Sequence, residues 1–174
     1  WKNNEYNAPV TRVYEIHAAG NGDSAVITAH VGMTGWSIQK FLDLEIQWTV
    51  HGGGQIDVTI QAQRCKEFRF LPRFGLRLFL PKAMDHVTYC GIGPNESYRD
   101  KRRAGWHGLF ETNLDALHED YIRPQENGSH WNTRELTVAD ASAAVKVTGA
   151  GFSFNASHYT QEELTNKGHN FELE

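Results

Sequence analysis

The chain has 174 residues, of which 40% are hydrophobic and 22% are charged, and its formal net charge is −4. This length suits one domain with a hydrophobic core, and the acidic balance argues against a nucleic-acid-binding protein. No apolar run reaches the ~18 residues of a membrane-spanning helix, so we expect no membrane partner. With two cysteines, Cys65 and Cys90, the sequence predicts no disulfide framework.

Alternating apolar and polar residues, the period-2 pattern of half-buried β-strands, dominate the chain. This pattern predicts strands at 10–18, 24–33, 41–50, 56–63, 74–80, 86–90, 133–138, 143–149 and 152–156. The clearest pair is a hairpin, because the three glycines of 51–55 allow the tight reversal between two alternating runs. The apolar positions expected in the core are Leu44, Ile46, Trp48, Ile56, Val58, Leu76 and Leu78.

One short helix is predicted at 160–168, where Thr160 and Glu163 have the spacing of a capping box and Gly168 is suited to end the helix. Many short strands with one-sided alternation favour an all-β fold, an antiparallel β-sandwich with long loops and this one helix near the C-terminus. The region 91–131 has few strand signals, and long irregular connections in compact domains are usually functional or form interfaces.

Several chemistries fit the sequence poorly. Gly91 and Gly93 follow a strand as in a dinucleotide motif, but a third glycine and a following amphipathic helix are missing, which favours a simple turn. The nine histidines lack the spacing of metal ligands, so no metal site is expected. There is no Gly-x-Ser-x-Gly, Cys90 has no activating neighbours, and the basic cluster 99–103 is typical of a solvated or salt-bridged loop.

Sugar binding fits better, because sugar sites combine aromatic faces with side chains that make paired hydrogen bonds. Residues of these types in 94–106 and 121–134 are Asn95, Glu96, Tyr98, Asp100, Trp106, Tyr121, Gln125, Glu126, Asn127, Trp131 and Arg134. Glu96 and Glu126 could form a glycosidase acid/base pair if the fold gave them a suitable separation. The alternative, favoured from the residues alone, is that these side chains satisfy the backbone of long loops.

Two stretches, "GIGPNESYRDKRRAG" (91–105) and "YIRPQENGSHWNTRELTV" (121–138), together resemble the C-terminal domain of the large bacterial β-galactosidases of glycoside hydrolase family 2. The first family motif is matched by Gly91, Gly93, Pro94, Glu96, Tyr98 and Asp100, and Lys101 stands at its basic position. The second is matched by Tyr121, Pro124, Glu126, Asn127, Gly128, Thr133, Arg134 and Leu136. The similarity runs over essentially the whole chain.

The resemblance implies a supersandwich similar in fold to galactose mutarotase. The family domain is longer, so residues 1–174 are expected to be one domain that is an internal fragment truncated at both ends, and the terminal Leu173–Glu174 resembles a cloning remnant. The family hydrolyses terminal β-galactosides such as lactose with two glutamates on a central barrel, where magnesium and sodium bind. No part of this chain matches that barrel, so the resemblance implies no catalytic residue, metal or other cofactor here.

The partners implied by the resemblance are the remaining domains of a homo-oligomeric β-galactosidase and a galactoside. A cytoplasmic and a periplasmic bacterial location stay open. The parent enzyme would be active, this part alone inactive, with the role of supporting the barrel and the active-site rim. The alternatives are a stand-alone carbohydrate-binding module and a mutarotase-like sugar epimerase.

The same resemblance predicts that residues 90–110 form a structured connection. Glu96, Tyr98 and Asp100 are expected to fix it by pairing with basic groups such as Arg102, Arg103 or Arg134. We expect 91–105 and 121–134 to pack together, with Glu96 or Glu126 bonded to an arginine or to backbone N–H groups, because long loops must satisfy their backbone donors.

Overall fold

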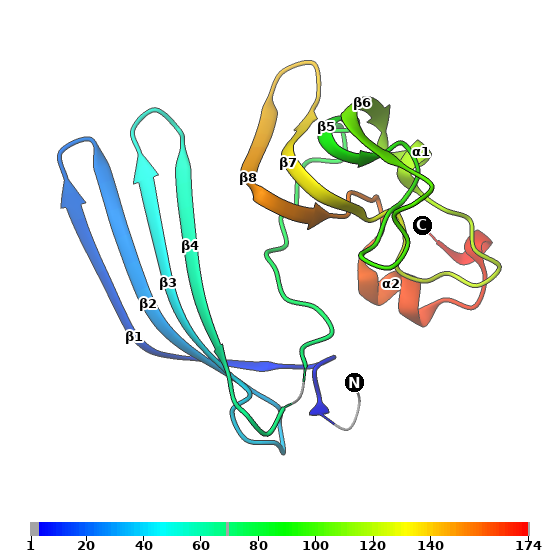
Figure 1. Ribbon diagram of the computed structural model, residues 1–174. Coiled ribbons are helices and arrows are strands. Elements are labelled where there is room, and N and C mark those ends of the chain that lie inside the picture. Colours follow the sequence, from blue (N-terminus) through cyan, green and yellow to red (C-terminus); the bar gives the residue numbers. More distant parts are fainter. Residues whose placement is uncertain (1–3, 69, 174) are drawn as a thin grey trace. The chain divides into compact units, whose positions relative to one another are not determined.

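The computed structural model describes residues 4–68 and 70–173 and is built almost entirely from antiparallel strands (Figure 1). In chain order its elements are β1 (Val10–Asn21), β2 (Ser24–Thr34), β3 (Leu42–His51), β4 (Ile56–Arg64), β5 (His86–Gly93), β6 (Trp106–Asn113), α1 (Leu114–Leu117), β7 (His130–Ala139), β8 (Ala144–Phe154), α2 (Gln161–Asn166) and the 3₁₀ helix η2 (Asn170–Glu172). The chain divides into two compact units, Trp1–Arg77 and Leu78–Glu174. Each unit holds one four-stranded antiparallel sheet. The predicted all-β antiparallel class is thus confirmed, with the two sheets that a β-sandwich requires.

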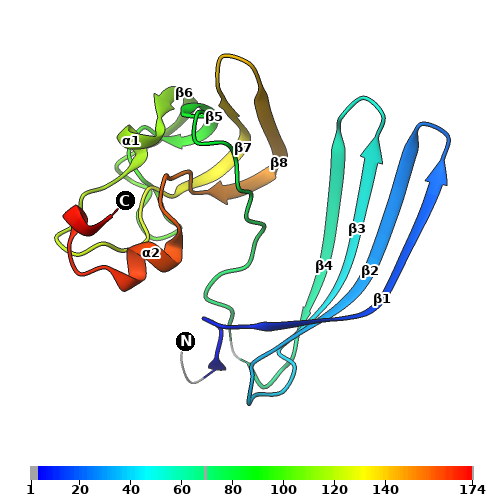
Figure 2. The same cartoon turned by 180° about the vertical axis from the view of Figure 1, so that it is seen from behind.

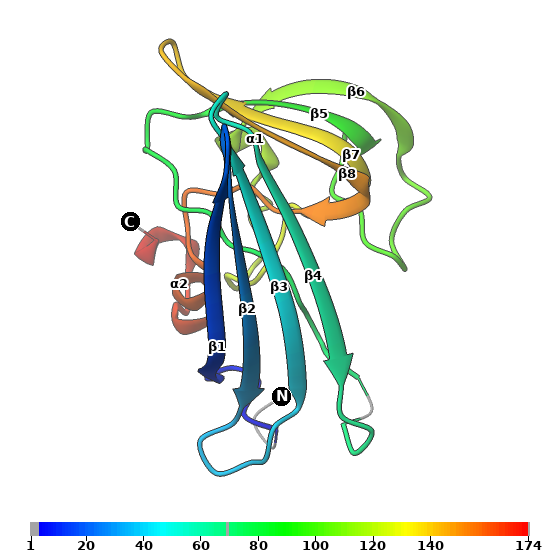
Figure 3. The same cartoon turned by 90° about the vertical axis from the view of Figure 1, so that its left-hand side faces the viewer.

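The sheet of the first unit has the strand order β1-β2-β3-β4, and Figure 3 shows these strands side by side. The two hairpins turn at the same end of the sheet (Figure 1). The predicted glycine reversal closes the second of them: Gly54 has a left-handed φ of 87°, and His51 N donates to Gln55 O at 2.9 Å. The hairpin prediction is therefore confirmed in both its strands and its turn.

The core of the first unit lies around the buried side chains Val31, Phe41, Leu42, Leu44 and Phe68. Of the predicted core positions here, Leu44 is buried, whereas Ile46, Trp48 and Val58 are half-buried. Ile56, Leu76 and Leu78 are 54%, 57% and 58% exposed, so their assignment to the core was wrong. The predicted strand 74–80 is irregular, and without a paired neighbour its alternating side chains do not share a covered face.

The sheet of the second unit has the order β6-β5-β7-β8, and Figure 2 shows α1 and α2 in the same unit. Its core is formed by Met84, Val87, Tyr89, Leu114, Leu117, Leu136, Val138 and Phe154. The sequence did not predict β6 and α1, which lie in the region with few strand signals. β6 is an edge strand in which no residue is fully buried, so burial requires few apolar residues in its sequence.

The predicted C-terminal helix is confirmed as α2, with its capping box. Thr160 Oγ1 accepts from Glu163 N at 3.2 Å, and Glu163 Oε2 accepts from Thr160 N at 2.7 Å. No helix within residues 4–68 and 70–173 is long and apolar enough to cross a membrane.

Replacing Thr160 by alanine should lower the free energy of unfolding by about 1 kcal/mol, because the backbone N–H of Glu163, which has no acceptor within the helix, loses its bond to the Thr160 hydroxyl. Chemical denaturation monitored by circular dichroism measures this. The control is Thr165→Ala in the same helix, where the lost bond is only a back-bond to Gln161 O. Equal losses in the two variants would contradict the capping role.

Candidate functional site

The two family-like segments meet in the second unit, as predicted. Ser97 N donates to Ser129 O at 2.6 Å, and Ser97 Oγ accepts from Trp131 N at 2.9 Å. His130 Nδ1 lies 3.1 Å from Ile92 O. The predicted packing of 91–105 against 121–134 is therefore confirmed by backbone and side-chain bonds.

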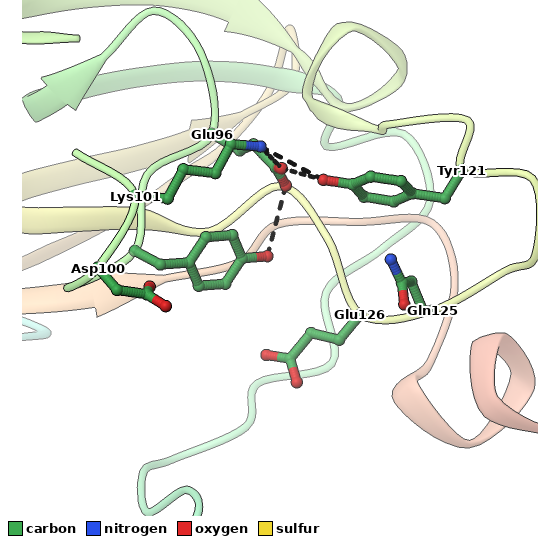
Figure 4. A pocket seen from close by; sticks show the side chains of 7 residues that line it. Glu96, Asp100, Lys101, Tyr121, Gln125 and Glu126 are labelled. Atoms are coloured by element: carbon green, nitrogen blue, oxygen red, sulfur yellow. Dashed lines mark hydrogen bonds and ion pairs between the residues drawn. The ribbon is translucent and has the colours of Figure 1, made fainter. Parts of the chain in front are cut away.

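Glu96 is the centre of this contact. Its side chain is 3% exposed, and its two oxygens receive four donors. Lys101 Nζ at 2.5 Å and the Tyr121 hydroxyl reach Oε1, while Gly128 N at 3.0 Å and the Tyr98 hydroxyl at 3.4 Å reach Oε2. Figure 4 shows Lys101 and Tyr121 converging on this carboxylate. The backbone bond from Gly128 confirms the expectation that a motif glutamate accepts from the neighbouring loop.

The pKa shifts of Glu96 and its partners keep Glu96 ionised, so it is not suited to transfer a proton. Burial alone would raise the pKa of Glu96, but the bonds from Lys101, Tyr121 and Gly128 outweigh it and hold the pKa below its ordinary value. The same carboxylate raises the pKa of Lys101. Burial, with the Glu96 charge as a second cause, raises the pKa of Tyr98 to about 12. Glu96 is therefore an ionised ion-pair partner at neutral pH, whereas a general-acid carboxyl needs a raised pKa.

The cation that pairs with Glu96 is Lys101, not one of the arginines expected from the sequence. A tight turn explains the choice: Tyr98 N donates to Lys101 O at 2.9 Å and Lys101 N to Tyr98 O at 3.1 Å, which folds Lys101 back toward Glu96. Arg102 instead lies over the ring of Trp131, 4.9 Å from its centroid. The prediction that Glu96 pairs with a basic side chain is therefore confirmed, but the partner is a lysine and not an arginine.

A shallow depression of about 350 Å³ opens beside this network. It is lined by Glu96, Tyr98, Asp100, Lys101, Tyr121, Gln125 and Glu126 (Figure 4). The fold thus brings together six of the candidates named from the sequence and adds Lys101, which the sequence placed in a solvated or salt-bridged basic cluster. The motif resemblance could have identified Lys101, because this residue stands at the basic position of the first motif.

The other candidates lie away from the depression's lining. Trp106 is 61% exposed on β6 and packs against Phe110, with ring centroids 5.8 Å apart. Asn127 is buried and serves the loops: its Oδ1 accepts from Glu119 N at 3.1 Å. Trp131 is half-buried in β7, and Arg134 is exposed on the same strand. Of these four, Asn127 supports the loops, whereas Trp106, Trp131 and Arg134 stand on strands.

Metal-ligand geometry is absent from the part of the chain that the structure describes: no group of three or more His, Cys, Asp or Glu side chains is placed to hold an ion. Cys65 and Cys90 are free and half-buried.

His130 is the most enclosed titratable group of the second motif, with 1% of its surface exposed. Its ring packs against the rings of Tyr89 and Phe154, with centroid distances of 4.5 and 5.2 Å, and those two rings also contact each other at 5.2 Å. Burial lowers the pKa of His130, although its bond to the Ile92 carbonyl opposes this. The neutral imidazole is therefore the form that fits the core.

We expect acid to destabilise the fold through His130. Its folded pKa lies below the ordinary value of 6.5, so below that pH the unfolded chain binds a proton that the folded chain does not. The free energy of unfolding should fall as the pH drops below about 6.5, toward the folded pKa. His130→Gln should flatten this part of the pH profile measured by urea denaturation, whereas His107→Gln, at an exposed position, should not. If the pH profiles of His130→Gln and His107→Gln were parallel to each other, His130 would not be the origin of the loss of stability in acid.

Comparison with known proteins agrees with the resemblance that the two motifs indicated. The family model described as "Beta galactosidase small chain" matches residues 1–174. Among curated relatives, the β-galactosidase of Actinobacillus pleuropneumoniae is 39% identical over 174 residues, and that of Staphylococcus xylosus is 35% identical over 175; both alignments cover all of this chain. The chain spans only 17% and 18% of the length of these relatives. The motif resemblance is thereby confirmed, and the chain belongs to the β-galactosidase small-chain family.

Proposed function

We propose that this chain is a non-catalytic β-sheet segment of a larger β-galactosidase, an enzyme that hydrolyses terminal β-D-galactosides such as lactose. Its role is to pack against the remaining polypeptide and to support the catalytic domain and the rim of its active site. The relatives support the enzyme class, because those of matching sequence are β-galactosidases about six times longer than this chain.

The observation that carries the supporting role is the division of the β1–β4 sheet into an apolar and a polar face. The register places Ile16, Ala29, Ile46 and Ile60 in one row and Ala18, Ile27, Trp48 and Val58 in the next. The opposite face has rows such as His17, Thr28, Gln47 and Thr59. An antiparallel sheet of this kind buries its apolar face and solvates the other.

Part of this apolar face is exposed. Val13, Ile16, Val50 and Ile56 have 55%, 65%, 37% and 54% of their surface accessible. Val50 and Ile56 are register partners, and exposed apolar surface of this kind marks an interaction site. Since five sixths of the relatives' length lies outside this segment, the covering layer is assigned to the remainder of the parent polypeptide.

The enclosure and ionisation of Glu96 support a catalytic site located elsewhere in the parent. This carboxylate is enclosed, ionised and bonded to four donors, so it has neither the raised pKa of a general acid nor the access of a nucleophile. The isolated 174-residue chain should therefore not hydrolyse a chromogenic β-galactoside. Turnover that disappears in Glu96→Gln or Glu126→Gln would overturn the proposal and make the chain a glycosidase by itself.

The supporting role is tested in the full-length parent with Ile56→Asp, which puts a charge on the apolar face. This variant should lower the parent's thermal stability and leave the isolated chain almost unaffected, because Ile56 is 54% exposed in the chain alone. Thr59→Asp, on the polar face of the same strand, is the matched control. Equal behaviour of the two parent variants would count against the proposal, as would an isolated chain whose solution mass is that of a dimer and returns to monomer in Ile56→Asp.

A further inference from the structure

We propose that the depression beside Glu96 is a binding site for a neutral sugar ring. The chemical class follows from the side chains of the depression itself; only the choice of galactosides as the first probes rests on the proposed function. No part of the inference requires catalysis by this chain.

The size and shape suit one or two sugar rings held at a surface. The volume of about 350 Å³ lies at the lower end of the range for small-molecule sites. The lining comes from two short stretches, 96–101 and 121–126, which the bonds to Glu96 hold against each other. The site is thus built on a loop contact that several hydrogen bonds hold in place.

The floor of the depression is pre-arranged by Glu96. Tyr98 and Tyr121 both donate their hydroxyl protons to this carboxylate, which fixes the position of each phenolic oxygen. The Lys101 ammonium has three N–H donors, of which Glu96 and Tyr121 receive two. Groups already fixed in position lose little conformational entropy when a ligand binds, which favours polar recognition at an open site.

The rim supplies carboxylate and amide groups in addition. Asp100 and Gln125 are exposed, and the half-buried Glu126 accepts a bond from Gln161 Nε2 at 2.9 Å. In Figure 4 the side chains of Asp100, Gln125 and Glu126 end without reaching the Glu96 network. Neighbouring hydroxyls of a sugar can donate to the carboxylates and accept from the amide and the ammonium.

The charged side chains of the depression determine which class of ligand it can bind. Three carboxylates and one ammonium line the depression, so a phosphate or another anion meets a net negative field. The lining includes no aliphatic side chain, which disfavours an apolar ligand. An organic cation would approach Lys101, whose raised pKa keeps it protonated. A neutral ligand with many hydroxyl groups satisfies both the donors and the acceptors.

The test is titration of the ¹⁵N-labelled chain with galactose, lactose, glucose, inorganic phosphate and an alkylammonium ion, followed by amide chemical shifts. Saturable shifts are expected for a sugar at the backbone of Lys101 and Gly128. Asp100→Ala and Gln125→Ala should each raise the Kd at least tenfold, while Glu67→Ala, an exposed carboxylate in the first unit, should leave it unchanged. Circular dichroism confirms that each variant keeps the wild-type fold.

The outcomes separate this inference from the proposed function. Absence of saturable shifts with every sugar, or tighter binding of phosphate or the cation than of sugars, overturns the sugar site. Unchanged Kd values in both depression variants overturn it as well. The proposed function is decided by different measurements, the hydrolysis assay on the isolated chain and the thermal stability of the Ile56→Asp and Thr59→Asp variants of the full-length parent, so either can fail without the other.

Discussion

Replacing Glu96 by alanine is expected to lower the free energy of unfolding by about 2–4 kcal/mol at neutral pH. The variant leaves the Gly128 N–H without its acceptor in a buried position and removes the common partner of Tyr98 and Tyr121. Lys101 contributes less to the loss, because its side chain is 56% exposed and water can solvate the ammonium. Urea denaturation followed by circular dichroism measures the difference.

The control for this prediction is Glu126→Ala. Glu126 belongs to the second motif and is also a glutamate, but it is half-buried and bonded to the side chain of Gln161. The sequence alone left open which of the two glutamates holds the loops together. Because Glu96 is more enclosed and its oxygens receive four donors, we expect its replacement to cause the larger loss of stability. A Glu126 variant as unstable as the Glu96 variant would show that enclosure of the carboxylate does not determine the cost.

The pH dependence gives a second readout for Glu96. Because its folded pKa is below the ordinary value of 4.5, the carboxylate stabilises the fold above pH 4.5 and this contribution is lost as the pH falls through the lower folded pKa. The stability of Glu96→Ala should therefore vary less with pH in this acidic range than that of the wild type. The contribution of Glu96 begins to be lost near pH 4.5 and that of His130 near pH 6.5, so the two losses begin at different pH values in one titration.

Local chemistry made the hairpins and α2 predictable. In 41–63 the alternation, the glycines and the two strands all indicate the same hairpin, and each was found where the pattern placed it. The capping box of α2 is likewise a contact between residues three apart, which spacing alone specifies. Such features depend on few long-range contacts.

Features set by long-range pairing were less predictable. The alternation of 74–80 resembles that of a strand, but a strand also needs a paired neighbour, and this segment is irregular. Conversely, β6 carries the weak pattern "WHGLFETN" and is held by its pairing with β5. The depression required contacts between residues about 25 apart in the chain, such as Tyr121 with Glu96, which the motif resemblance suggested as packing but could not specify atom by atom.

Replacing Gly128 by alanine should lower the free energy of unfolding by about 3 kcal/mol or more, for two reasons that add. Gly128 has a left-handed φ of 66°, which strains a residue with a side chain, and a Cβ there would lie 2.3 Å from the backbone oxygen of Leu117. Relieving that clash shifts the Gly128 N–H, the donor that joins the second motif to Glu96. The control in the same unit is Gly168→Ala, whose Cβ would meet nothing nearer than 3.7 Å and whose φ is not left-handed. The difference between the two denaturation midpoints is the measurement. A Gly128 variant as stable as the Gly168 variant would mean that the loop relaxes freely, and Glu96 would then not be anchored by the second motif as described.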